Sequence, residues 1–555
     1  MAKLPPPDPR LLKALPFLQE GVQLYQQGRA DEAEVNFLQA LKKAPDHPDA
    51  LYFLGLIRMN RGKPEEALKL MTKATRSSPR FAEAHFVTGS ILNILGRPQE
   101  AVAAYRRAIA ISPEHVNALN HLGNTLRLVG QLDEAIAAYD KAIAAAPDFA
   151  AAHNNRGTAL AERGDLDAAL VNFDQALVLQ SDFADAHNNR GGVLQRLNRP
   201  DDAIESYDRA LLIKADFAEA LNNRGSALQD LNQHHDALHW HRRALEIRPD
   251  SAEAHFNAAS AHLALGELAQ GWPEFEWRWG KKDLAPLRRA IRQPLWFGDS
   301  SISGKTILLH AEQGFGDTIQ FVRYVPLVAK LGAKVVLEVP RALRDLCATL
   351  EGVSTLITRG DKLPPFDVHT PLLSLPLAFR TETTTVPADV PYLSAPPDRA
   401  AKWRDRLSLP GRKIGLAWSG RMYPRNRSIP FAQLLPLLSL PDAVFVSLQQ
   451  KMPQADAAQL AEQKNVLHFG SEIQDFADTA AIIASLDLIL SIDTSVAHVA
   501  GALGKPLRLM LLFSSDFRWL VDREDNPWYP TARLFRQRSI GDWSNVVSRI
   551  AADLA

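Results

Sequence analysis

The sequence LDLILSIDTSVAHVAGALGKP, residues 486–506, joins an apolar run to a helical pattern through Asp493, Thr494 and Ser495. The apolar run predicts a buried strand, and the small hydroxyl residues after it mark the start of a helix. A helix N-terminus has unpaired backbone N–H groups and about half a positive charge, so this turn suits an anion such as a diphosphate. The alternative is that the three residues only cap the helix.

Short apolar runs of the same kind recur on both sides of this segment, separated by helical patterns. They predict parallel strands, because strands that are buried on both faces read as continuous apolar runs. The runs are 305–312, 333–340, 354–358 and 366–372, then 412–420, 443–449, 465–469, 486–493, 507–513 and 531–537. We therefore expect two Rossmann-like lobes, residues 301–395 and 396–555, with a ligand in the cleft at the carboxyl ends of their strands.

The first strand of the first lobe ends in a glycine-rich turn. Gly314 and Gly316 permit close approach by a ligand, and Asp317 stands at the start of the next helix. The carboxylate is a candidate for proton transfer, and the alternative is that it caps its helix.

The first strand of the second lobe leads into a loop that is rich in arginine and serine. Guanidinium groups form bidentate hydrogen bonds to phosphate oxygens, which suits a diphosphate, and the alternative is a group of solvated surface arginines. One turn into the helix after Asp493, His498 is a further possible donor, although a satisfied core histidine is the expected role. The candidate anion-binding residues are Ser419, Arg425, Arg427, Ser428, Lys451, Thr494, Ser495 and His498, with Asp493 shaping the turn.

The N-terminal half of the chain repeats with a period of 34 residues. Small residues stand at Gly21, Gly55, Gly89, Gly123, Gly157, Gly191, Gly225 and Ala259, and alanines recur at fixed distances after them. Small side chains at these places let two antiparallel helices approach closely. The pattern resembles the tetratricopeptide repeat from residue 10 to about 270, which implies an α-solenoid with a concave groove over residues 1–280.

Asparagines recur on one face of the first helix of several repeats. Stacked amides can bond an extended polypeptide backbone irrespective of its sequence, and the arrangement resembles the asparagine ladder of O-GlcNAc transferase. The alternative, of equal weight, is that the asparagines pair between adjacent repeats and stabilise the stack. The residues are Asn154, Asn155, Asn188, Asn189, Asn222, Asn223 and Asn257.

The repeats end at an aromatic cluster, GWPEFEWRWG, at residues 271–280. The cluster could be a binding surface, but its expected role is to cap the last repeat and attach it to the next domain. Residues 281–300 are then a linker.

The region after residue 300 resembles the heptosyltransferase-like enzymes of glycosyltransferase family 9. The matching elements are Gly316-Asp317, Ser419-Gly420 with Arg427-Ser428, and the run from Asp493 to Pro506. The resemblance implies a GT-B fold, a base at Asp317, and contacts from Thr494 and Ser495 to the donor's diphosphate. It also implies inversion at the anomeric carbon without a metal ion. The plan of repeats plus transferase is similar to that of O-GlcNAc transferase.

Composition narrows the choice of partners. The chain has 63 basic and 63 acidic residues, so no net charge attracts nucleic acid, and no apolar stretch is long enough to span a membrane. A single cysteine indicates a reducing cytoplasm, and neither a metal site nor a cofactor is expected. The expected partners are a nucleotide sugar, a polypeptide or other macromolecular acceptor in the repeat groove, and a possible second copy of the chain.

The sequence thus favours a metal-independent inverting glycosyltransferase whose repeats present its acceptor. The alternative is a non-catalytic repeat scaffold with a degenerate transferase region that mediates protein–protein interaction.

Overall fold

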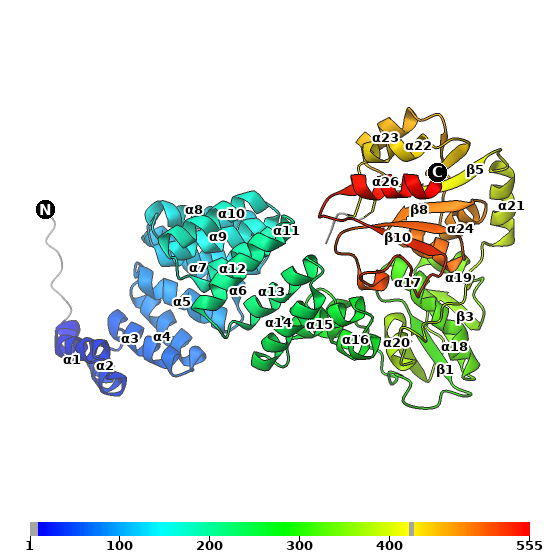
Figure 1. Ribbon diagram of the computed structural model, residues 1–555. Coiled ribbons are helices and arrows are strands. Elements are labelled where there is room, and N and C mark those ends of the chain that lie inside the picture. The colour runs from blue at the N-terminus through cyan, green and yellow to red at the C-terminus, as the bar shows by residue number, and fades with distance from the viewer. Residues whose placement is uncertain (1–8, 421–426) are drawn as a thin grey trace. The chain divides into compact units, whose positions relative to one another are not determined.

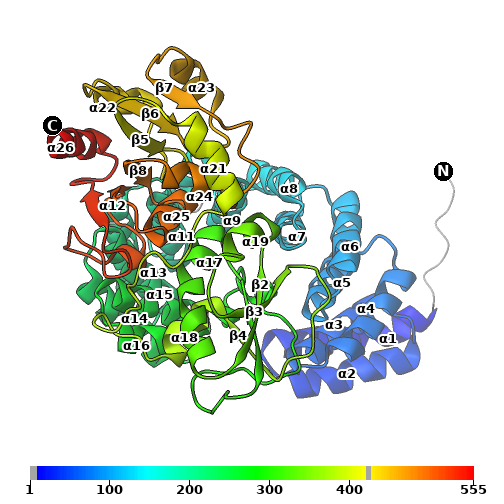
Figure 2. The same cartoon turned by 90° about the vertical axis from the view of Figure 1, so that its right-hand side faces the viewer.

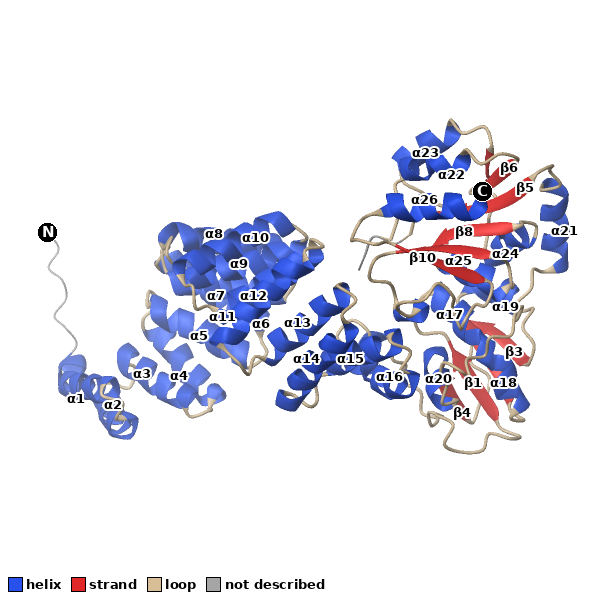
Figure 3. Ribbon diagram, viewed as in Figure 1, coloured by secondary structure: helices blue, strands red, loops and turns tan. Residues whose placement is uncertain are grey.

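The computed structural model describes residues 9–420 and 427–555, so the predicted anion-binding residue Arg425 lies outside the described residues. The chain forms two compact units, Met1–Ala215 and Asp216–Ala555 (Figure 1). The first unit contains only helices and loops among its described residues, whereas the second combines helices with parallel sheets (Figure 3).

The first unit consists of antiparallel helix pairs, each pair matching one period of the sequence. The helices are α1 (Pro9–Gln26), α2 (Ala30–Lys43), α3 (Pro48–Asn60), α4 (Pro64–Ser77), α5 (Ala82–Ile94), α6 (Pro98–Ile111), α7 (Val116–Leu128), α8 (Leu132–Ala145), α9 (Ala150–Arg163), α10 (Leu166–Leu179), α11 (Ala184–Arg196) and α12 (Pro200–Ile213). The second unit begins with two more such pairs, α13 (Ala218–Asp230) with α14 (His234–Ile247), and α15 (Ala252–Ala264) with α16 (Leu268–Phe275).

The periodic glycines lie where the two helices of a pair cross most closely. A Cβ atom added at Gly123 would lie 2.4 Å from the Tyr139 ring, and one at Gly191 would lie 2.5 Å from the Tyr207 ring. In each of the first seven repeats, such an atom would come within 2.8 Å of the side chain sixteen positions later. The structure therefore confirms that the repeated small residue permits close helix packing.

Among its described residues, the rest of the second unit contains ten parallel strands. Nine of them lie within predicted apolar runs, and the strand Val353–Thr358 begins one residue before its run. The first group is β1 (Thr306–His310), α17 (Phe315–Phe321), α18 (Val325–Lys330), β2 (Lys334–Val339), α19 (Arg344–Cys347), β3 (Val353–Thr358), β4 (Val368–Pro371) and α20 (Leu375–Ala378). The second group is α21 (Pro397–Arg406), β5 (Arg412–Ala417), α22 (Leu435–Leu438), β6 (Ala443–Ser447), α23 (Gln454–Ala461), β7 (Val466–His468), α24 (Phe476–Ala484), β8 (Leu488–Ile492), α25 (Ser495–Ala502), β9 (Leu507–Leu511), β10 (Ala532–Arg536) and α26 (Trp543–Leu554).

The strands form two separate sheets (Figures 1 and 2), with orders β3-β2-β1-β4 and β10-β9-β8-β5-β6-β7. When the strands of the second sheet are numbered 1 to 6 along the chain, their order across the sheet is 3-2-1-4-5-6, which is a doubly wound order. The four strands of the first sheet, numbered in the same way, have the order 3-2-1-4. The order reverses between β1 and β4 in one sheet and between β5 and β8 in the other. Ligands bind at such points, beyond the carboxyl ends of the strands.

Two helices that follow these central strands pack against each other, α17 after β1 and α25 after β8. The contact is close at Gly316, where a Cβ atom would lie 2.7 Å from the His498 ring. Gly316 therefore allows the carboxyl ends of the two sheets to approach each other.

The aromatic cluster at 271–280 joins the last helix pair to the α/β region. Trp272 is buried and makes edge contacts with Phe321, Phe517 and Trp528. Nearby, the fully buried Arg278 donates to Ser374, next to the carboxyl end of β4, at 2.7 Å. This confirms attachment as the role of the cluster.

Candidate functional site

The loop after β5 and the turn after β8 are tied together at the reversal point of the second sheet. Arg427 donates from Nη1 to the carboxylate of Asp493 at 2.6 Å and to its carbonyl oxygen at 3.0 Å. Next to Arg427, the Ser428 hydroxyl accepts at 3.1 Å from the backbone N–H of Gly420, which lies at the start of the loop. The structure thus brings together the two sequence segments that were predicted to bind an anion.

Thr494 and Ser495 stand in the turn between β8 and α25. Thr494 is the N-cap residue, yet its side chain makes no capping bond to the described helix, and it is half-buried together with Ser495. The carboxylate of Asp493 is occupied by Arg427 rather than by the helix. The structure thus shows no side-chain capping bond from Thr494, and anion binding at this turn stays a prediction.

Gln449, two residues after β6, shapes this site, although the sequence did not single it out. Its side-chain oxygen accepts from the backbone N–H groups of Trp418 and Ser419, both at 3.1 Å. Its amide nitrogen donates to the carbonyl oxygen of Lys451 at 3.1 Å, and the Lys451 side chain is exposed. A glutamine directly after an apolar strand was the available signal.

Asp317 both caps its helix and forms an ion pair. Its Oδ2 accepts from the backbone N–H of Gly314 at 2.8 Å, and its Oδ1 accepts from Arg518. The side chain retains 18% exposure. The structure therefore shows the capping role. It also shows an ion pair with Arg518, which follows β9 of the second sheet and which the sequence did not indicate.

Arg518 is the centre of a buried charge network that links both sheets. It donates to Asp516 at 2.7 Å as well as to Asp317, and Asp493 lies close enough to contribute to its electrostatics. Burial disfavours the charged guanidinium, but the three aspartates outweigh burial and raise the pKa of Arg518 above its ordinary value. Burial conversely raises the pKa of Asp493, and Arg427 opposes this effect.

His498 is a core histidine in this structure. Its ring is buried and stacks on Trp519. A hydrogen bond of 2.9 Å joins Nδ1 to the Tyr529 hydroxyl. Burial lowers the pKa of His498 to about 3, so the ring is neutral near pH 7. Contact with a donor diphosphate would require His498 to leave this packing.

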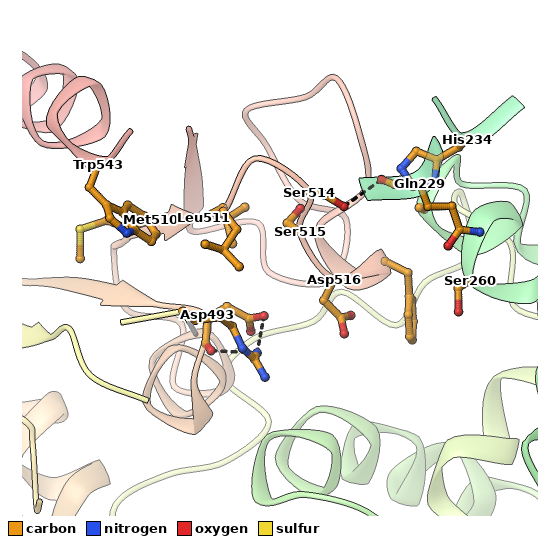
Figure 4. A pocket seen from close by; sticks show the side chains of 14 residues that line it. Gln229, His234, Ser260, Asp493, Met510, Leu511, Ser514, Ser515, Asp516 and Trp543 are labelled. Atoms are coloured by element: carbon orange, nitrogen blue, oxygen red, sulfur yellow. Dashed lines mark hydrogen bonds and ion pairs between the residues drawn. The ribbon is translucent and has the colours of Figure 1, made fainter. Parts of the chain in front are cut away.

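A cavity of about 330 Å³ adjoins the Arg427–Asp493 pair. Figure 4 shows Asp493 and Asp516 on one side and residues of the last two helix pairs on the other, with Ser514 bonded to Gln229. The lining residues are Gln229, His234, Ser260, Ala264, Arg427, Asp493, Met510, Leu511, Leu512, Ser514, Ser515, Asp516, Phe517 and Trp543. The helix pairs thus contribute one wall of the cavity.

The asparagines on the repeat helices bond to one another between neighbouring repeats. Asn189 donates to Asn154 at 3.0 Å, Asn155 donates to Asn120 at 3.0 Å, and Asn257 donates to Asn222 at 3.2 Å. The first member of each predicted pair, Asn154, Asn188 and Asn222, is buried, while Asn155, Asn189, Asn223 and Asn257 are half-buried. The structure therefore shows the stack-stabilising arrangement, and a role in acceptor binding stays a prediction.

Family models of the tetratricopeptide repeat match seven stretches, 18–70, 54–116, 104–137, 123–162, 157–198, 184–217 and 217–248. Residues 18–248 are a tetratricopeptide repeat (TPR) array. Stacked TPR units form an extended surface that typically binds peptides or proteins. The TPR array is followed by the α/β region described above.

Protein FlbA of Caulobacter vibrioides is 28% identical over 323 residues, which are 53% of this chain and 54% of FlbA. The chain thus spans about half the length of this curated relative.

Solved TPR structures are also similar. YrrB, a TPR protein with an unusual peptide-binding site, is 23% identical with a TM-score of 0.30, and the match covers 33% of this chain and 95% of YrrB. PilW, a widely conserved type IV pilus biogenesis factor, is 21% identical with a TM-score of 0.35, and the match covers 37% of this chain and 96% of PilW.

Two properties of residues 9–420 and 427–555 bear on the choice of partners. No helix in these ranges is long and apolar enough to cross a bilayer. No group of three or more His, Cys, Asp or Glu side chains in them is arranged to hold a metal ion. Whether a reaction here proceeds without metal stays a prediction.

Proposed function

We propose that the protein is an inverting glycosyltransferase of the GT-B type that uses a nucleoside-diphosphate sugar and receives a polypeptide or other macromolecular acceptor from its TPR array. The observation that carries the proposal is the Arg518–Asp317 ion pair. It connects the candidate base on the first sheet to the candidate anion site on the second. The strand orders of the two sheets, and the packing of α17 on α25 beside their reversal points, also support a GT-B transferase.

In the proposed reaction an acceptor hydroxyl attacks the anomeric carbon and passes its proton to Asp317. The bond between that carbon and the diphosphate oxygen breaks, and the nucleoside diphosphate leaves with the bonding electrons. Attack from the face opposite the leaving group inverts the configuration. Both oxygens of Asp317 already have partners, so the hydroxyl must share Oδ1 with Arg518 or displace it.

The leaving diphosphate would bind at the start of α25. Backbone N–H groups at Thr494 and Ser495 and the positive end of the helix would offset its charge, with Arg427 and Ser419 alongside. The adjoining cavity of about 330 Å³ is large enough for part of a nucleotide, and Met510 and Trp543 give it apolar walls.

The second candidate function is a TPR scaffold whose α/β region no longer turns over. The observation that favours it is the occupation of both Asp317 oxygens within the chain. The TPR array supports protein interaction under either function.

The test is a thermal-shift screen of the full chain against nucleoside diphosphates and their sugar conjugates. A ligand at one hundred times its dissociation constant stabilises the unit that binds it by about 2.7 kcal/mol. We expect a shift with one nucleotide family that is lost in Thr494→Val and retained in Thr355→Val, a control on the exposed part of β3. No shift with any nucleotide would contradict the transferase and favour the scaffold.

A further inference from the structure

One turn position of the repeats has a left-handed backbone throughout the array, and two repeats fill it with asparagine instead of glycine. The position has positive φ at Gly28, Gly62, Gly96, Gly130, Gly164, Asn198, Asn232 and Gly266. Glycine adopts this conformation without strain, and asparagine is among the few other residues that tolerate it. An asparagine here therefore contributes a side chain at some conformational cost.

Asn232 uses that side chain to hold the loop between β9 and the short helix η7 (Phe517–Trp519). Its amide nitrogen donates to the carbonyl oxygen of Phe513 at 2.8 Å. Asn232 thus ties a repeat turn to a residue 281 positions later in the chain.

Two further bonds fasten the same loop to the last two repeats. Ser514 donates from its hydroxyl to the carbonyl oxygen of Gln229 at 2.9 Å, as Figure 4 shows. At the far end of the loop, the backbone N–H of Val521 donates to the carbonyl oxygen of Ala264 at 3.0 Å. Residues 513–521 are therefore held at both ends by the repeats.

The fastened loop carries the central guanidinium, that of Arg518, and one of its two carboxylate partners, Asp516. Asp516 and Arg518 lie within it, and Arg518 reaches from it to Asp317 on α17. A shift of the loop would move the Arg518 side chain relative to Asp317, because Arg518 is part of the loop and Asp317 is part of α17.

We infer that Asn232 is a positioning residue, through which the seventh repeat sets the geometry of the Arg518–Asp317 pair. The consequence for sugar transfer rests on the proposed function, but the positioning itself does not. The last two repeats are, on this inference, part of the site rather than only a place for an acceptor to bind.

Asn232→Gly is a sharp test, because glycine keeps the left-handed turn and removes only the side chain. Asn198→Gly is the matched control at the same turn position one repeat earlier. In the full chain we expect amides in residues 513–521 to exchange hydrogen about fivefold faster in Asn232→Gly, the factor that one net hydrogen bond contributes. Asn198→Gly should leave their exchange unchanged.

A second readout follows the buried Trp519 beside Arg518. With 5-fluorotryptophan incorporated, the ¹⁹F resonance that Trp519→Phe removes should shift or broaden in Asn232→Gly and not in Asn198→Gly. Asn232→Asp should behave as Asn232→Gly does, since a carboxylate cannot donate to the Phe513 carbonyl. Unchanged exchange and an unchanged resonance in both Asn232 variants would overturn the inference.

Neither readout needs a substrate, so failure of the proposed transferase would not alter them. If transfer is observed, Asn232→Gly should lower kcat more than it raises KM. A loosened loop with unchanged kcat would overturn the catalytic part of the inference.

Discussion

Arg518 and Asp317 stand 201 residues apart in the sequence, and their side chains form an ion pair between the two halves of the α/β region. Arg518 also holds Asp516, so one guanidinium bridges two carboxylates in a buried setting. Removal of one partner from such a network leaves an uncompensated charge and is costly. The relative position of the two sheets and the geometry of the candidate base are consequently coupled.

Asp317→Asn should abolish most of any transfer, and it should also lower stability because it removes one carboxylate partner of the buried Arg518. The loss of a general base lowers rates by about 10² to 10⁴-fold, and the asparagine oxygen can still accept from Gly314. Turnover of the full chain with the nucleotide sugar found by screening measures this. The control is Asp367→Asn, because the Asp367 carboxylate also accepts from a backbone N–H, that of Thr306, but lies at the opposite ends of β1 and β4. Unchanged turnover in Asp317→Asn would remove Asp317 as the base.

Gly191→Ala and Gly192→Ala should change stability in opposite directions, although the residues are neighbours in α11. A Cβ atom at Gly191 would lie 2.5 Å from the Tyr207 ring, so we expect a loss of about 1–3 kcal/mol from overpacking. At Gly192 the nearest atom is 3.9 Å away, and alanine should stabilise the helix by about 0.5–1 kcal/mol. Denaturant unfolding of both variants measures the difference, and equal effects would contradict the packing argument.

His241→Tyr should stabilise the protein more at acid pH than at pH 8. His241 fills the place that Tyr207 occupies one repeat earlier, and burial lowers the pKa of His241 from 6.5 to about 3. Protonation of His241 therefore favours the unfolded chain. As the pH falls below 6.5, the free energy of unfolding decreases by at most about 1.4 kcal/mol per pH unit. Tyrosine does not titrate in that range.

The measurement for His241→Tyr is the difference in unfolding free energy between variant and wild type at pH 8, 6 and 5. The unfolding free energy of the variant should exceed that of the wild type by more at pH 6 than at pH 8, and by more still at pH 5. A difference independent of pH would show that His241 takes up a proton in the folded state as readily as in the unfolded state.

Asn189→Ala should destabilise the repeats by about 1 kcal/mol, because it removes the bond to Asn154 in the preceding repeat. Asn36→Ala is the control, since the Asn36 amide bonds only within its own helix. Denaturant unfolding gives the stability, and binding of an extended peptide to the full chain gives the groove function. Undiminished stability with weakened peptide binding would assign the asparagines to acceptor binding rather than to the stack.

Most of the architecture could be predicted from local sequence. The period of 34 residues located the helix pairs, because each unit repeats the same small-residue contacts, such as Gly191 with Tyr207. The ten strands in residues 9–420 and 427–555 followed from apolar runs, since strands that are buried on both faces leave a continuous apolar signature. The strand order then placed Ser419 and Thr494 at one reversal point.

The contacts that complete the site could not be predicted in the same way. Arg518 and Asn232 act through partners 201 and 281 residues away, and no periodic pattern marks either contact. Asn232 does depart from the glycine found at the same position in most repeats, and this departure was the one local signal. His498 illustrates the converse, because a histidine near an anion motif proved to be packed in the core.

The boundary between Ala215 and Asp216 has a practical meaning for protein engineering. The seventh and eighth repeats belong to the same compact unit as the sheets, so a chimera that exchanges the array for another should retain them. A graft joined at this boundary would replace six repeats and preserve the bonds from Asn232, Gln229 and Ala264 to the loop. Recombination at the sequence end of the array, near residue 280, would sever those bonds.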